Sequence, residues 1–149
     1  MKTRIHAIAG VVGFLTILSF WTSTVTVELF GTPAAIAAVK SWILSGMFVL
    51  IPAMAIVGAT GMSLGRKRRD RLTKVKKTRM PVIAANGLVI LVPAAFYLAS
   101  KANAGDFDDW FYAVQAVELI AGAANLTMMG LNIRDGLKMT RRIGQAAPQ

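Results

Sequence analysis

The sequence predicts an all-α membrane protein, a single domain built as an up-down-up-down bundle of four transmembrane helices. Hydrophobic residues make up 55% of the 149 residues and charged residues only 16%, whereas a soluble domain has about 25% charged residues. Four stretches are long enough to cross a hydrocarbon core, which takes about 20 apolar residues. These runs are continuous and do not alternate with period two, which argues against the strands of a membrane barrel.

The first two predicted spans are joined by a tight turn. The first covers about 6–29, and its apolar stretch exceeds the roughly 7–15 residues of a signal-peptide core. We therefore expect a membrane helix there rather than a cleaved leader. Pro33 suits the first turn of the second span, 34–64, in which Pro52 predicts a kink.

The third and fourth predicted spans follow a strongly basic connection. Residues 65–79 are expected to form a basic cytoplasmic loop, after which the third span covers 80–101, with a second predicted kink at Pro93. A short polar loop then leads to the fourth span, 110–134. Connections this short make sequential helices antiparallel neighbours, which gives the up-down-up-down order.

Lysine and arginine are concentrated at one end of the predicted bundle. Of the 17 basic residues, all but Lys40 and Lys101 lie before the first span, in the loop 65–79 or after the fourth span. Cytoplasmic loops of membrane proteins carry an excess of Lys and Arg, so this asymmetry predicts that both termini are cytoplasmic. We therefore expect a multi-pass protein of a cytoplasmic (inner) membrane.

The basic loop is expected to contact anionic lipid headgroups, which attract clustered positive charge beside membrane helices. The residues expected to make this contact are Arg66, Lys67, Arg68, Arg69 and Arg71. A specific phosphoinositide-like lipid or an acidic protein is an alternative partner. Nucleic acid is not expected, because no aromatic residue interleaves with these charges to stack on bases.

Two opposite charges are expected at similar depths inside the spans. Lys40 lies about 9 Å into the second span and Glu118 about 12 Å into the fourth, measured from the same side at 1.5 Å per residue. We expect an ion pair that holds the bundle together. Two alternatives are a protonated Glu118 bonded to Gln115, Tyr97 or a backbone carbonyl, and a proton or cation relay in a small transporter or channel.

Polar and small residues recur along one face of the fourth predicted span. They are Glu118, Gly122, Asn125, Met129 and Asn132, at spacings of 4, 3, 4 and 3. Such spacing defines one helix face, which we expect to turn inward. Asn86 of the third span lies at the depth of Asn125, so we expect a hydrogen bond between them, worth about 0.6–2 kcal/mol.

His6, the single histidine, predicts an alternative function. Gly10 and Gly13 follow it on the same face, where a flat ring could lie against the backbone, and Met128 and Met129 lie at the matching depth of the fourth span. A histidine–methionine pair is a known haem ligation, so the hypothesis is a b-type haem between the first and fourth spans. Against it, four-helix membrane cytochromes use paired histidines, and an interfacial histidine facing headgroups is the simpler interpretation.

Two further groups are assigned to the side opposite the basic loop. Asp106, Asp108 and Asp109 are interpreted as a solvated acidic loop, because their spacing does not match a calcium-binding loop. Trp21, Trp42 and Trp110 are interpreted as an aromatic belt at one interface.

The sequence lacks the motifs of catalytic and metal sites. Cysteine is absent, and no zinc-protease, nucleophile-elbow, Walker or dinucleotide-binding motif occurs. We therefore expect no catalytic residue and no metal site, and a non-enzymatic accessory or structural subunit that works in the lipid bilayer, in a homo-oligomer or in a larger membrane complex. The alternatives are the haem protein using His6 and the transporter or channel using Glu118.

Overall fold

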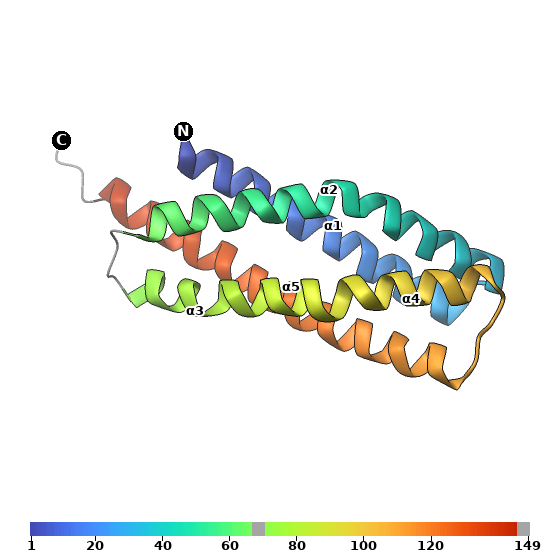
Figure 1. The fold of residues 1–149 in the computed structure, drawn as a ribbon. Helices are drawn as coiled ribbons and strands as arrows, with labels where there is room; N and C mark the ends of the chain where they lie inside the picture. The colour runs from blue at the N-terminus through green and yellow to red at the C-terminus, as the bar shows by residue number, and fades with distance from the viewer. Residues whose placement is uncertain (67–70, 146–149) are drawn as a thin grey trace.

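The computed structural model describes residues 1–66 and 71–145, with residues 139–145 described by their backbone alone. All regular structure within these ranges is helical. The elements are α1 (Lys2–Phe30), α2 (Pro33–Gly65), α3 (Arg71–Ala85), the π-helix η1 (Asn86–Leu91), α4 (Val92–Asn103) and α5 (Asp109–Gln145). In Figure 1, α3, η1 and α4 follow one another as a single rod, so the bundle consists of four long rods.

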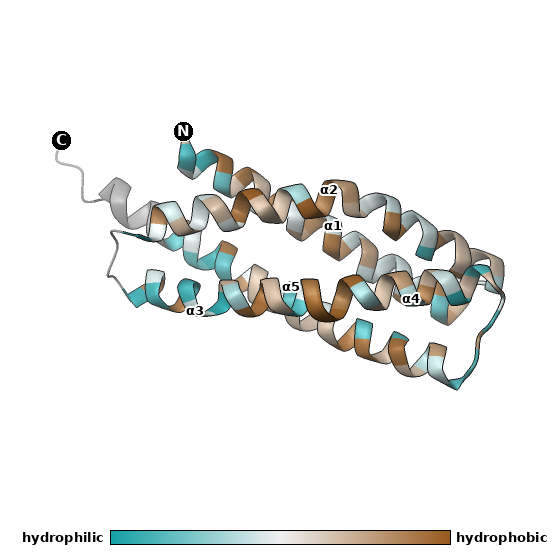
Figure 2. Ribbon diagram, in the orientation of Figure 1, coloured by the Kyte–Doolittle hydropathy of each residue, from teal (hydrophilic) through white to brown (hydrophobic). Residues whose placement is uncertain are grey.

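Four helical segments are long and apolar enough to cross a membrane, which confirms the predicted class of an all-helical protein with four candidate spans. They are Lys2–Phe30, Pro33–Gly65, Arg71–Asn103 and Asp109–Lys138. Figure 2 shows brown, hydrophobic residues along the middle of the rods and teal, hydrophilic residues at the start of α3 and at the N-terminus. We call the end with the two termini and the start of α3 the basic end, and the end with the α4–α5 loop the acidic end.

The helix that carries the third candidate span begins before the predicted span. Much of the expected loop 65–79 is helical, because α3 begins at Arg71 and runs through Pro81 without a break. Lys, Arg and Leu are good helix formers, and no glycine or proline interrupts the chain before Pro81. Pro81 was expected to open the span, but it lies inside the helix.

The rod is perturbed next to Pro93, where the sequence predicts a kink. The six residues of η1 form a π-helix, and the N–H of Val92 reaches five residues back to the carbonyl of Gly87. Proline has no N–H to offer the carbonyl four residues before it, and its ring crowds that carbonyl. A local π-helix is one way in which a helix accommodates such a disruption.

Buried apolar residues form three clusters along the bundle instead of one continuous core. Near the acidic end the cluster contains Ile36, Leu98, Ala102 and Phe111. The other two clusters contain Ile43, Met47 and Ala95, and, nearer the basic end, Ile17, Ile83 and Met129. One cavity lies between the last two clusters and is lined by members of both, and a second lies beside the cluster nearer the basic end.

Candidate functional site: two adjoining cavities

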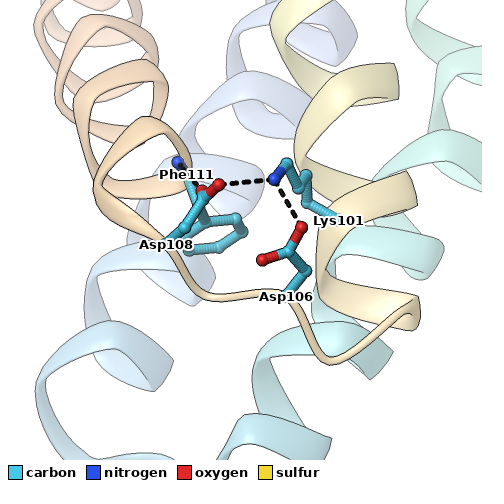
Figure 3. Close-up of polar contacts among 4 residues, drawn as sticks. All are labelled: Lys101, Asp106, Asp108 and Phe111. Carbon is cyan, nitrogen blue, oxygen red and sulfur yellow. Dashed lines mark hydrogen bonds and ion pairs between the residues drawn. The ribbon is translucent and has the colours of Figure 1, made fainter.

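The acidic end is closed by a polar clamp in the α4–α5 loop, drawn in Figure 3. The Lys101 ammonium donates to Asp106 at 2.5 Å and to Asp108 at 2.6 Å. The other carboxylate oxygen of Asp108 accepts from the backbone N–H of Phe111 at 2.8 Å, so Asp108 caps the N-terminus of α5. The Lys101 bond and the Phe111 bond lower the pKa of Asp108. The loop expected to be merely solvated is therefore held in place.

The structure brings Lys40 and Glu118 together. Lys40 Nζ lies 2.5 Å from Glu118 Oε2, and the side chain of Lys40 is fully buried while that of Glu118 is 13% exposed. Gln115 Nε2 donates to the same oxygen at 3.1 Å. Glu118 thus has two donors, from α2 and from its own helix, whereas Tyr97 is not a hydrogen-bond partner within the described residues.

The structure also brings Asn86 and Asn125 together. Asn86 Nδ2 donates to Asn125 Oδ1 and to the carbonyl of Ala121, both at 2.9 Å. Asn125, which is only 2% exposed, donates in turn to the carbonyl of Ile83 at 3.3 Å. These three bonds join α5 to the rod where α3 passes into η1.

The polar face of α5 turns inward, as its spacing predicts. Gly122, Asn125 and Met129 are buried, and Glu118 and Asn132 are half-buried. The burial of this face confirms that prediction, and it places these residues along the wall of an interior space.

Trp21 is a site residue that sequence reasoning assigned to the wrong environment. Instead of lying in an interfacial belt, its half-buried ring turns into the bundle, and Nε1 donates to the carbonyl of Leu119 at 2.9 Å. A Cβ atom at Gly122 would lie 3.0 Å from Trp21 Cδ1, so glycine allows the ring to approach α5 closely. The sequence signal for this contact was that Gly122 lies four residues after Glu118, on the face of α5 that was expected to turn inward.

All four rods surround a cavity of about 450 Å³, which we call the mid-bundle cavity. Its wall is overwhelmingly apolar, with Ile17 and Trp21 from α1, Met47 from α2 and Leu88 from η1. Glu118 and Asn125 also line it, but both are engaged in the hydrogen bonds described above. The cavity therefore offers a mainly apolar environment in which the Glu118 and Asn125 side chains are already hydrogen-bonded.

A second cavity, of about 470 Å³, lies toward the basic end, and we call it the basic-end cavity. Its wall is more polar and includes His6, Lys76, Lys77 and Asn132. Several glycines also line it, namely Gly10, Gly58, Gly61, Gly65 and Gly136.

Two polar groups of the basic-end cavity form no hydrogen bond or close ion pair in the part of the chain that the structure describes. Lys76 is half-buried, and its Nζ lies 3.3 Å from where a Cβ of Gly136 would be, so the ammonium points at α5. The carboxylate of Asp135 attracts this ammonium from a distance, while its direct ion pair, at 2.9 Å, is with Arg79. The buried Oδ1 of Asn132 likewise accepts no hydrogen bond there.

His6 lies in the wall of the same cavity. Its Nδ1 is 2.9 Å from Thr60 Oγ1, and that hydroxyl donates its single proton to the carbonyl of Ile56 at 2.5 Å. Thr60 is therefore placed to accept from His6 Nδ1, and the backbone of Val57 is a further hydrogen-bond partner of the ring. Met129 lines this cavity with His6, whereas Met128 packs against the core cluster of Ile17, Ile83 and Met129 without lining the cavity.

The basic-loop residues expected to contact lipid are only partly described. Arg66 and Arg71 are exposed at the basic end. Lys67, Arg68 and Arg69 lie outside the described residues. Close to these residues, an ion pair between Arg79 and Asp135 joins α3 to α5. This pair was not predicted from the sequence, although Asp135 stands out there as a single acidic residue within a basic C-terminal segment.

Comparison with protein-family models, with curated proteins and with solved structures finds no match to this chain.

Proposed function

We propose that the chain is a multi-pass protein of the cytoplasmic membrane that acts as a non-enzymatic accessory or structural subunit and binds an anionic lipid headgroup in its basic-end cavity. In this proposal the bundle has up-down-up-down order across the bilayer, with both termini and the basic end in the cytoplasm. The skewed distribution of lysine and arginine supports that orientation.

The observation that carries the headgroup site is the half-buried Lys76, whose ammonium points into the bundle without an ion pair among the described residues. A half-buried charge that lacks a close ion pair is only partly compensated by the distant Asp135, so an anion bound here would stabilise the folded protein. Lys77 adds a second positive charge to the same wall. The depth of the cavity, at the basic end of the candidate spans, suits a headgroup at the membrane surface.

An architectural role for Glu118 is supported over a relay. Its Oε2 accepts from both Lys40 and Gln115, so the carboxylate is held by neighbouring side chains. Such a pair joins α2 and α5 without any transported ion.

Thermal unfolding in mild detergent tests the headgroup site. Added phosphatidylglycerol should raise the Tm of the native protein, because a ligand that binds only the folded state stabilises it, whereas zwitterionic phosphatidylcholine should not. Lys76→Gln should lose most of this shift. Lys74→Gln is the matched control, because it removes the same charge from an exposed position of α3 outside the cavity wall. An equal response of the two variants would contradict the proposal.

A second candidate function is b-type haem binding in the same cavity. It is favoured by one observation, that His6 and Met129 line one cavity. The absorption spectrum of protein purified from a haem-replete host tests this candidate. A Soret band that disappears in both His6→Ala and Met129→Ala would establish it, and a colourless protein would remove it.

A further inference from the structure

We infer that the ligand is a single long-chain anionic amphiphile whose hydrocarbon chain fills the mid-bundle cavity while its headgroup occupies the basic-end cavity. This inference rests on the proposed headgroup site, and it adds the chemical class of the rest of the ligand. It turns two separate cavities into one binding site for one molecule.

The two cavities adjoin each other. Met54, Ile83 and Ala84 line both of them, so the junction is formed by α2 on one side and by α3 on the other. From this junction the basic-end cavity leads to Lys76 and Lys77, and the mid-bundle cavity leads away into the apolar centre. The wall of the combined site is therefore basic at one end and apolar at the other, which matches the charged headgroup and the hydrocarbon chain of an anionic lipid.

The mid-bundle cavity suits hydrocarbon rather than water or a polar group. Water bound inside a protein needs two to four polar partners, and an apolar cavity of about 150 Å³ is known to stay dry and bind benzene. The mid-bundle cavity is about 450 Å³, and of the polar side chains in its wall Trp21, Glu118 and Asn125 already form hydrogen bonds, which leaves the hydroxyl of Thr24. An alkyl or prenyl chain would satisfy this wall without displacing any hydrogen bond.

The length of the combined site also points to a long chain. Along α5 its wall extends from Gly136 at the basic end to Glu118. At 1.5 Å per residue this distance is about 27 Å, close to the thickness of a hydrocarbon core of about 30 Å. A soluble phosphate compound would fill only the basic-end part.

A side opening would let the chain enter from the bilayer. Ile51 on α2 and Leu88 on η1 belong to the wall of the mid-bundle cavity, yet they are 48% and 64% exposed. The wall is therefore open toward the lipid-facing surface between α2 and the π-helix. A second chain of a two-chain lipid can remain outside in the bilayer.

Trp21 provides a reporter for the chain, because it lines the mid-bundle cavity. Trp42 and Trp110 are 49% and 71% exposed, so the double variant Trp42→Phe/Trp110→Phe leaves Trp21 as the single tryptophan of the chain. In mild detergent, phosphatidylglycerol with brominated chains should quench most of the Trp21 emission in a saturable manner. Brominated phosphatidylcholine at the same mole fraction should give only weak quenching that does not saturate.

Plugging the junction provides the matched test. In the single-tryptophan protein, Ala84→Phe should abolish the saturable quenching, because the larger ring would lie where the walls of the two cavities meet. Ala85→Phe is the control, since Ala85 is adjacent in α3 and exposed like Ala84, but lines neither cavity. Ala55→Phe, in the α2 wall of the mid-bundle cavity, is a second plugging variant in case the first does not fold.

The outcomes separate this inference from the proposed function. A Lys76-dependent rise in Tm with phosphatidylglycerol but no quenching of Trp21 would overturn the chain site and leave the headgroup site intact. Saturable quenching that is equal for both brominated lipids and is lost in Ala84→Phe would also overturn it, because chain and headgroup would not belong to one anionic molecule. Displacement of the lipid by soluble glycerol phosphate would assign the basic-end cavity to a free anion instead.

Discussion

The side chain of Lys40 has no exposed surface, and its ammonium group pairs with Glu118 on another helix. Such a pair contributes little net stability, because removing both charges from water costs nearly as much as their attraction returns. Its main effect is on specificity, since the two side chains link α2 to α5 across the interior of the bundle, although the described backbones of these helices do not pack against each other.

Breaking this pair should be more harmful than deleting it. Glu118→Gln leaves the buried Lys40 without its ion-pair partner and with only the weaker attraction of Glu28 on α1, which should lower the free energy of unfolding by up to about 3–5 kcal/mol. The double variant Lys40→Met/Glu118→Gln should recover part of that loss, because neither charge of the pair is left. Denaturation in detergent micelles measures all four members of the cycle, and additive effects would show that the two residues are not coupled.

Asp108 gives a pH-dependent prediction at the acidic end. Its lowered pKa means that its contribution to stability is fully present above the ordinary aspartate pKa of about 3.9 and is lost as the pH falls through the lowered value. Thermal unfolding of native protein and Asp108→Asn should therefore differ at neutral pH and converge in strong acid. The side chains of this clamp are 22–51% exposed, so added salt should shrink the difference. A difference that persists unchanged in acid would contradict this role of Asp108.

At the scale of elements, the helices approach each other through small residues and backbone carbonyls. Trp21 of α1 donates to a carbonyl of α5, and the Asn86–Asn125 pair joins η1 to α5. Helices in lipid lack a hydrophobic force between them, so close packing and interhelical hydrogen bonds carry their association. The contact between α1 and α5 depends on glycine at 122, where the indole ring leaves no room for a methyl group.

Gly122→Ala should therefore loosen α1 from α5. The added Cβ would lie 3.0 Å from Trp21 Cδ1, and overpacking of this kind costs about 1–3 kcal/mol. Gly58→Ala is the control, because a Cβ there meets no atom within 4 Å, and alanine favours a helix over glycine. Chemical denaturation and the emission maximum of Trp21 in the single-tryptophan protein report stability and ring environment. Equal behaviour of the two alanine variants would count against this packing.

For the whole molecule, the strongest sequence signals were the long uncharged runs, and they predicted four membrane-length helices that the structure has. The positions of polar residues along the spans also predicted that Lys40 pairs with Glu118 and Asn86 with Asn125. Depth along a helix can be counted in residues, and a polar group in an apolar span needs a partner at the same depth. The start of α3 was missed, since a run of Lys and Arg is compatible with both loop and helix. The cavities were missed as well, because a cavity depends on side chains from all four rods, whose rotations a single sequence does not define.

The orientation of the whole bundle can be tested with cysteine labelling, since the chain has no native cysteine. Ala104→Cys, in the exposed α4–α5 connection, should react with a membrane-impermeant maleimide in intact cells. Lys74→Cys, exposed at the basic end, should react only after the membrane is permeabilised. The reverse pattern would invert the bundle, and labelling of both positions in intact cells would argue against the four-span arrangement.

The distance in sequence between Lys40 and Glu118, 78 positions, has a consequence for biosynthesis. Chains emerge N-terminus first, so α2 is made long before the helix that carries its counter-charge. The first helical hairpin must therefore wait without the Glu118 partner of Lys40, and until α5 has been inserted the nearby acidic group is Glu28 of α1. The Lys101 clamp has no such delay, because its acidic partners follow within seven residues. Completion of the bundle is thus coupled to arrival of its last helix, and a chain interrupted before α5 would present Lys40 without its ion-pair partner to the cell's quality control.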